Sequence, residues 1–303
     1  MSICIGIPVK NESQNIPLLQ NQLSRLINKT KYTGITFCIC INDNLSTDGS
    51  IERLLAWQDS DNRVKIYRLH QPLDFQSSIQ DLMKKASADA FAILQSDLQD
   101  PVADFEKLLD TYITNQEQIV AGRAVVRAGS IFVNKIRDIF YWLLSSSSGT
   151  NYVSGFQDFY ILPKYVYSQA ASLPNSRLFI RGFLYFNFTK IIFIDYQRTD
   201  RIFGESKFNF VKMYDLALDG LLLYGRRFIR ILSITSFLIF ISSLIFGLVI
   251  LIMSSLGFDF GSKGWTSIIL SISILVSILG MLAGVILEYL IRIYSRLNLP
   301  YKD

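Results

Sequence analysis

Apolar and polar positions alternate in a regular way through the first part of the chain. Continuous apolar runs, typical of buried strands, cover residues 3–9, 35–41, 64–69 and 90–95. Helical spacing of apolar residues follows each run, at 16–27, 51–57, 79–86 and from Phe105 onward. This alternation predicts an α/β fold, with a mainly parallel sheet that has helices on both faces.

The last third of the chain has a different pattern. Residues 231–253 and 264–287 are two uncharged, apolar runs. Each is long enough to cross the roughly 30 Å hydrocarbon layer as a helix, which needs about 20 residues. Buried core helices are the alternative, but these are usually shorter and amphipathic. We therefore expect a soluble domain at 1–207, an amphipathic juxtamembrane helix at 208–227 and a membrane domain at 228–303.

Basic residues near the two apolar runs predict their orientation. They precede the first run and follow the second, at Arg226, Arg227, Arg230, Arg292, Arg296 and Lys302. By the positive-inside rule both termini and the N-terminal domain are cytoplasmic. Met1–Val9 lacks a basic leader, so no signal peptide is expected. These features predict a multi-pass protein of the cell (inner) membrane.

Two further segments have amphipathic spacing. Ser130–Leu144 is one, and its polar side is basic; Phe208–Tyr224 is the other and leads directly into the first apolar run. For Ser130–Leu144, packing in the soluble domain and lying on the membrane surface are equally good interpretations.

Charge and composition argue against two classes of function, nucleic-acid binding and histidine-dependent hydrolysis. The net charge of +5 is concentrated near the apolar runs, which favours anionic lipid headgroups over nucleic acid, and no nucleic-acid-binding motif occurs. Cys4, Cys38 and Cys40 lie in strand-like runs without a partner cluster, so we interpret them as reduced core residues. His70 is the only histidine and lies at a strand end, which argues against a Ser-His or Cys-His hydrolase.

Polar side chains follow successive predicted strands. Asn11 and Glu12 follow the first, Asp43 ends the second, and Asp97 and Gln99 follow the fourth. Because the carboxyl ends of parallel strands meet at one edge of a sheet, these residues predict a nucleotide pocket there.

Residues 94–101, Leu-Gln-Ser-Asp-Leu-Gln-Asp-Pro, place acid and amide groups between a strand and a helix that Pro101 opens. Oxygen ligands spaced by one residue suit a hard cation such as Mg²⁺. We interpret Asp100 as a helix cap in front of Pro101.

Four motifs in this order resemble a known family. They are Ile-Pro-Val-Lys-Asn-Glu at 7–12, Asn-Asp-Asn-Leu-Ser-Thr-Asp-Gly at 42–49, Gln-Ser-Asp-Leu-Gln-Asp-Pro at 95–101 and Arg-Ile-Phe-Gly-Glu-Ser-Lys-Phe at 201–208. The set resembles family 2 glycosyltransferases with the GT-A fold, in the polyprenyl-phosphate branch that includes dolichyl-phosphate mannose synthase and bacterial polyprenyl-phosphate glucosyltransferases. The resemblance covers residues 3–225. It implies an inverting, metal-dependent transfer, with Mg²⁺ or Mn²⁺, from a nucleotide sugar such as a UDP-sugar to polyprenyl phosphate.

The resemblance also implies residue roles. In chain order, Pro8, Asn11 and Glu12 line the nucleoside pocket, Asp43 contacts the base or ribose, Asp97 and Gln99 hold the metal, Arg123 and Arg127 lie near the active site, Asp158 contacts the sugar or acceptor, and Arg198, Arg201, Ser206 and Lys207 bind phosphates. Of these, Asp97, Asp158, Arg201 and Lys207 form the implied catalytic set.

Three departures from the family pattern have consequences. Gln95 stands where the family usually has an acid, so we expect weak Mg²⁺ affinity without nucleotide and tighter affinity with it. The turn at 42–46 is one residue longer than the commonest family turn. Tyr160 stands where many relatives have Arg, which we connect with a different sugar.

Alternatives remain open from the sequence. A phosphate acceptor is already anionic and has little need of a strong base, whereas a lipid-linked saccharide or another hydroxyl acceptor would need one, with Asp158 as the candidate. A catalytically silent membrane scaffold is a third reading, favoured by Gln95. Small residues in both apolar runs permit close helix packing, within one chain or between copies in a homo-oligomer: Ser242, Ser243, Gly247, Ser273, Ser277, Gly280 and Gly284.

Overall fold

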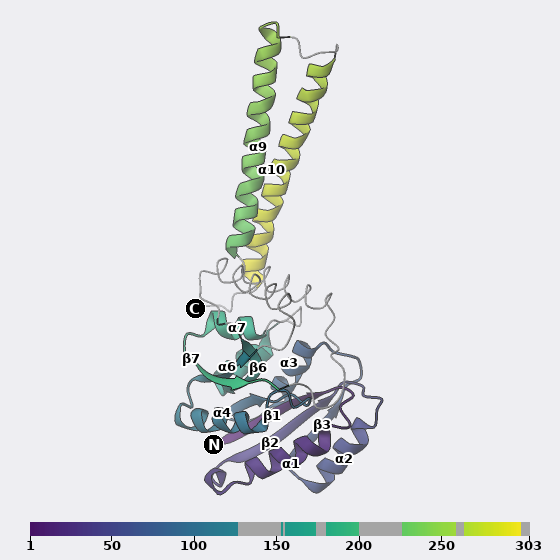
Figure 1. Cartoon of the computed structure of the whole chain (residues 1–303), viewed down its shortest axis with the longest axis vertical. Coiled ribbons are helices and arrows are strands. Elements are labelled where there is room, and N and C mark those ends of the chain that lie inside the picture. Colours follow the sequence, from purple (N-terminus) through teal and green to yellow (C-terminus); the bar gives the residue numbers. More distant parts are fainter. Residues whose placement is uncertain (127–152, 154, 174–179, 200–225, 259–263, 298–303) are drawn as a thin grey trace. The chain divides into compact units, whose positions relative to one another are not determined.

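The computed structural model describes residues 1–126, 153, 155–173, 180–199, 226–258 and 264–297 (Figure 1). The chain divides into two compact units. One comprises residues 1–141 and 152–216, and the other comprises residues 142–151 and 217–303.

The first unit is built on one seven-stranded sheet in the order β3-β2-β1-β4-β6-β5-β7. Its strands are β1 (Ser2–Val9), β2 (Thr36–Asp43), β3 (Val64–Arg68), β4 (Ala90–Ile93), β5 (Ile119–Val126), β6 (Phe156–Pro163) and β7 (Ile191–Gln197). The four strands β3, β2, β1 and β4 are parallel, as predicted. Only β6 runs antiparallel, to both β4 and β5, while β7 is parallel to β5.

Helices cover both faces of this sheet (Figure 1). They are α1 (Ile16–Ile27), α2 (Ser50–Ser60), α3 (Phe75–Lys85), α4 (Val102–Thr114), α6 (Lys164–Ser172) and α7 (Ile180–Asn187), with a short 3₁₀ turn, η1 (Thr30–Tyr32). The side chains of β1 alternate between the faces: Ile3, Ile5 and Ile7 belong to a core with residues of α1 and α4. Gly6 faces α3, because a Cβ there would lie 3.5 Å from the Leu82 Cβ.

The predicted helix at 16–27 coincides with α1, whereas α3 begins four residues earlier than the predicted 79–86. The physical reason is an N-cap: the Asp74 carboxylate accepts a hydrogen bond from the Ser77 N–H at 2.9 Å. The earlier start extends the helix to include Gln76, which is buried.

Strand register aligns the loops that follow β1, β2 and β4. Val9 pairs with Asp43, and Gly6 pairs with Ile93. Residues 10–12, 43–50 and 94–100 therefore leave the sheet at its carboxyl edge, where α/β sheets bind ligands.

The second unit contains α9 (Arg226–Ser255) and α10 (Trp265–Leu297), which pack side by side (Figure 1). Arg230–Ser255 and Trp265–Leu290 have mean hydropathies of 2.7 and 2.6, and by length and composition both could cross a membrane. They contain nearly all of the two predicted runs.

The small residues of α9 and α10 pack these helices together within one chain. The Ser243 hydroxyl donates to the Ser273 carbonyl at 2.9 Å, and a Cβ on Gly280 would lie 3.1 Å from the Ser236 carbonyl oxygen. Packing within the chain therefore accounts for these small residues except Ser242, whose hydroxyl donates to the Ile239 carbonyl within α9.

Candidate functional site

The loops after β1 and β2 are cross-linked by side-chain hydrogen bonds to backbone. Asn11 has a left-handed backbone, with φ of 55°. Its N–H donates to the Ser46 hydroxyl at 2.9 Å, and its side-chain oxygen accepts from the Thr47 N–H at 2.8 Å. The Glu12 N–H donates to the Ser50 hydroxyl at 2.9 Å. Asn11 and Glu12 thus bring together the two loops predicted to line a nucleoside pocket.

Asp43 lies at the base of these loops with its side chain fully buried. One carboxylate oxygen accepts from the Ser46 N–H at 3.2 Å. The other, Oδ2, has no hydrogen-bond partner among the described residues, and the Arg68 Nε lies 3.9 Å from it. A buried carboxylate oxygen without a hydrogen bond is costly, so its position suits a bound hydroxyl or N–H donor.

The turn at 95–100 is fastened on two sides. The Ser96 hydroxyl donates to the Pro8 carbonyl at 2.9 Å, which ties the turn to β1. The Thr199 N–H donates to the Gln99 carbonyl at 3.0 Å, which ties it to the chain after β7. Leu98 takes a left-handed conformation, with φ of 58°, and this turns the backbone sharply between Asp97 and Gln99.

Asp97 is 4% exposed, and its carboxylate accepts from the Gln99 N–H at 3.2 Å. A carboxylate is a suitable ligand for Mg²⁺ or Mn²⁺, since Mg²⁺ is commonly held by one or two carboxylates together with substrate phosphates. The Gln99 side chain can add a carbonyl oxygen. The Gln95 side chain instead accepts from the Arg198 guanidinium at 3.4 Å. The oxygen ligands that Asp97 and Gln99 can supply therefore fit a divalent ion that is also bound by the phosphates of a nucleotide.

The interpretation of Asp100 as a helix cap is wrong. The N-cap of α4 is Pro101, without a side-chain cap bond, and the Asp100 side chain is fully buried. Its carboxylate accepts from the Tyr196 hydroxyl and lies 3.2 Å from the Arg198 Nε. Tyr196 lies in β7 and Arg198 directly follows that strand, so Asp100 joins the turn to β7 and to the residue after it.

Asp100 should make stability depend on pH. Burial raises its pKa from 3.8 to about 6, against the opposing effects of Arg198 and Tyr196. Because the native pKa is the higher one, the contribution of Asp100 is greatest below pH 4 and is lost as pH rises to about 6. We expect wild type to lose about 3 kcal/mol relative to Asp100→Asn over this interval.

Unfolding of both proteins by urea between pH 4 and 7, followed by intrinsic fluorescence, checks this expectation. A stability difference that stays constant over the interval would contradict the assignment.

Asp158, on β6, contacts Gln76 and Arg181, two residues that no sequence motif indicates. Its Oδ2 accepts from the Gln76 side-chain amide at 3.1 Å and lies 3.2 Å from the Arg181 Nε. Its Oδ1 is buried and has no hydrogen-bond partner in the described part of the chain. The carboxylates of Asp97 and Asp158 both add to the raised pKa of Asp100, so the three acids are neighbours.

No local pattern marks Gln76 or Arg181 as functional. Gln76 is one polar residue in the first turn of α3, and its side-chain oxygen accepts from the Ile180 N–H at 3.1 Å. The Arg181 guanidinium also donates to the Phe156 carbonyl at 2.9 Å. Helix α7 therefore brings a cation to Asp158, near Tyr160, the position where the resemblance has Arg. Burial raises the Tyr160 pKa well above its ordinary value.

Among the described residues, no contact joins Arg123 to Asp97. It forms a bidentate ion pair with Asp195 across β5 and β7, at 2.5 and 2.7 Å, and this pair is exposed. Several predicted positions lie outside the described residues: Arg127, Arg201, Ser206, Lys207 and the two amphipathic segments.

Comparison with known proteins shows which family the chain resembles. The model of "Glycosyl transferase family 2" matches residues 4–173. An uncharacterized glycosyltransferase of Bacillus subtilis, YkcC, is 27% identical over 96% of this chain and 89% of its own. The bactoprenol glucosyl transferase of Shigella phage SfV is 27% identical over 97% of this chain and 94% of its own.

A solved structure shows the same fold. Glucosyl-3-phosphoglycerate synthase from Mycobacterium tuberculosis, in complex with Mn²⁺, UDP-glucose and phosphoglyceric acid, has a TM-score of 0.52 at 16% identity. The match covers 73% of this chain and 77% of that one. The predicted GT-A fold is confirmed.

Proposed function

Because the chain belongs to glycosyl transferase family 2, it is a glycosyltransferase, and we propose that it transfers a sugar from a nucleotide donor to polyprenyl phosphate. The observation that carries this proposal is the extent of similarity to bactoprenol glucosyl transferases. It spans 97% of the chain, so it includes the two apolar helices as well as the sheet. A membrane-held lipid acceptor explains why both parts occur in one protein.

The donor site follows from the carboxyl edge of the sheet. We assign Asp43 Oδ2 to a hydroxyl or N–H of the nucleoside, and the loops at Asn11 and Glu12 to the walls of its pocket. Asp97 and Gln99 would hold Mg²⁺ or Mn²⁺ at the donor diphosphate, where the ion neutralises charge on the leaving group. UDP is the proposed nucleotide.

The acceptor's chemistry sets what the remaining residues do. An oxygen of the acceptor phosphate attacks the anomeric carbon while the bond from that carbon to the donor diphosphate breaks, with inversion. The attacking oxygen is already anionic, so positioning and electrostatics supply most of the rate. Arg198 lies beside the turn at 95–100, where it contacts Asp100. Together with Arg201, Ser206 and Lys207 it is proposed to bind phosphates. Asp158 is proposed to orient the sugar or acceptor.

The proposed setting is a cell membrane crossed twice, by α9 and α10. The basic residues around the two spans favour cytoplasmic termini and a cytoplasmic active site. The acceptor phosphate would then lie at headgroup level.

Transfer can be measured with the full chain purified in detergent. Incubation with Mg²⁺ or Mn²⁺, undecaprenyl phosphate and a panel of labelled nucleotide sugars should give a labelled lipid, and EDTA should prevent it. Absence of a lipid product with every donor would overturn the proposal.

A hydroxyl acceptor, such as a lipid-linked saccharide, is the second candidate. The unpartnered, buried Oδ1 of Asp158 favours it, because a general base needs an oxygen free to accept a proton. Asp158→Asn separates the two candidates. With a hydroxyl acceptor transfer should be lost while donor binding remains, whereas with polyprenyl phosphate measurable transfer should remain.

A further inference from the structure

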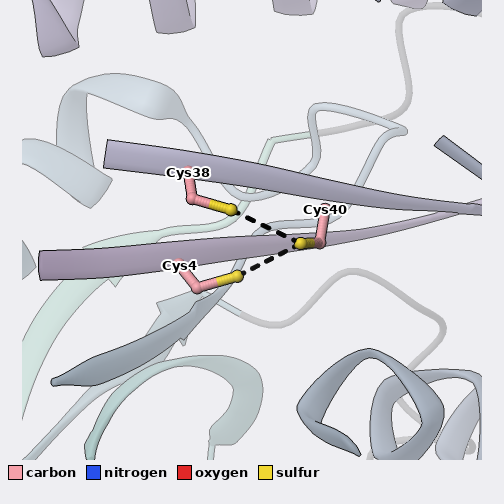
Figure 2. A group of neighbouring side chains, drawn as sticks. All are labelled: Cys4, Cys38 and Cys40. Atoms are coloured by element: carbon pink, nitrogen blue, oxygen red, sulfur yellow. Dashed lines mark hydrogen bonds between the residues drawn. The ribbon is translucent and has the colours of Figure 1, made fainter. Parts of the chain in front are cut away.

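Three cysteine sulfurs converge on one face of the sheet (Figure 2). This face packs against α3, because Gly6, which pairs with Cys40 and follows Cys4 by two residues, faces Leu82 of that helix. The Cys4 thiol on β1 donates to the Cys40 sulfur on β2 at 3.4 Å, and the Cys38 sulfur lies 3.6 Å from that of Cys40. All three sulfurs lie within 4.8 Å of one another, and none is in a disulfide. The expectation that these cysteines have no partner cluster is therefore wrong.

Strand pairing creates this cluster, which we call the thiol site. In the parallel register of β1 and β2, Cys4 pairs with Cys38 and Gly6 pairs with Cys40. Cys40 follows Cys38 by two residues, so both side chains point to the same face. Cys4 is distant from Cys38 and Cys40 in the sequence, so no local sequence pattern predicts that the three residues lie together.

The spacing of the sulfurs matches that of ligands around one metal ion. With metal–sulfur bonds of about 2.3 Å, tetrahedral or trigonal geometry separates two sulfurs by about 3.7 to 4.0 Å. The two distances from the Cys40 sulfur, 3.4 and 3.6 Å, differ from this by a few tenths of an ångström, and the Cys4 and Cys38 sulfurs lie within 4.8 Å of each other. Small rotations of the side chains would therefore complete the coordination.

We propose that Cys4, Cys38 and Cys40 bind a single soft, thiophilic cation, of which Cu(I) fits best. Thiolate ligands select soft ions over Mg²⁺ and Mn²⁺. Structural zinc takes four ligands, and among the described residues no fourth His, Cys, Asp or Glu joins the group. Cu(I) accepts three sulfur ligands.

The surroundings of the thiol site allow an ion to enter and be held. Cys4 and Cys40 are buried, while Cys38 is partly exposed and offers a path from solvent. Lys65 lies near enough to Cys38 to interact favourably with a thiolate there. Ligation releases thiol protons to solvent, and Lys65 offsets part of the negative charge that remains.

The thiol site is separate from the donor site. Cys40 precedes Asp43 by three residues on β2, a distance of about 10 Å along the strand. Occupancy of one site therefore does not require the other, and binding of the cation can be tested without any sugar donor.

The test is an anaerobic Cu(I) titration of the full-length protein against the chelator bicinchoninate. We expect one Cu(I) per chain and a near-ultraviolet band from thiolate-to-copper charge transfer. Cys38→Ser should weaken binding at least about tenfold, as should Cys4→Ala and Cys40→Ala. His70→Ala is the matched control, because it removes the only histidine, which is exposed and outside the cluster, and should leave binding unchanged.

Thermal unfolding supplies a second measurement, since Cys38 is partly exposed and Cys38→Ser should fold. Cu(I) should raise the Tm of wild type but not of Cys38→Ser. Absence of Cu(I) binding, or equal binding by Cys38→Ser, would overturn the site. Tighter binding of Zn²⁺ than of Cu(I) in competition would overturn the choice of cation.

Discussion

Asp97→Asn should lower kcat/KM for sugar transfer by about 10³-fold, equivalent to about 4 kcal/mol of transition-state stabilisation. Gln95 is neutral and contacts Arg198, and Asp100 is buried against Arg198 and Tyr196. Asp97 is the acid of this turn that the family resemblance assigns to the metal, and we propose that it holds the ion on the donor diphosphate. The measurement is the initial rate of labelled lipid formation over a range of donor and Mg²⁺ concentrations.

Asp104→Asn is the matched control. Asp104 lies in the first turn of α4, where its carboxylate pairs with Lys107 at 2.6 Å, and its loss should leave transfer unchanged. Calorimetry should find weak Mg²⁺ binding to the empty protein and tighter binding with UDP present. An Asp97→Asn rate within about threefold of wild type would contradict the metal assignment, as would tight Mg²⁺ binding without nucleotide.

Arg181→Ala should destabilise the sheet-containing unit by about 3–5 kcal/mol, because it leaves the buried Asp158 carboxylate without its cation. The side chains of Arg181 and Asp158 are only 13% and 7% exposed. Urea unfolding can be followed through intrinsic fluorescence, since Trp57 is buried in α2. The expected result is a lower urea midpoint with an unchanged slope.

The double variant Arg181→Ala with Asp158→Asn tests the cause. Removing both charges leaves no unpaired ion, so the double variant should be more stable than Arg181→Ala alone. Arg123→Ala is the matched control, since its pair with Asp195 is exposed and should cost about 1 kcal/mol or less. If the double variant is as unstable as Arg181→Ala, the loss comes from packing and not from charge.

The strands and the loops that follow them were predictable because both depend on neighbouring residues. The apolar run at 3–9 and the spacing at 16–27 correspond to β1 and α1. The parallel order of the first four strands then places Asn11, Asp43 and Asp97 at one edge. The contact of Gln95 with Arg198 was not predicted, because Arg198 is distant in the sequence.

The environment of Asp158 could not be predicted from the sequence. The resemblance marked the residue, but its environment depends on α3 and α7, whose contributing residues are 82 and 23 positions away. Gln76 is buried only because α3 starts at Phe75, after the Asp74 cap. A polar residue in a first turn is usually solvated, so nothing local distinguished it.

The sequence by itself determined the α/β class, the two apolar helices, the family resemblance and the edge of the sheet where the donor is proposed to bind. These follow from periodicity and from motif order, which are local properties of the chain. Only the tertiary structure decided the partners of Asp100, the contacts of Asp158 with Gln76 and Arg181, and the grouping of Cys4 with Cys38 and Cys40. Each depends on which distant strands and helices become neighbours, and the free energy of burying those side chains depends on that three-dimensional packing.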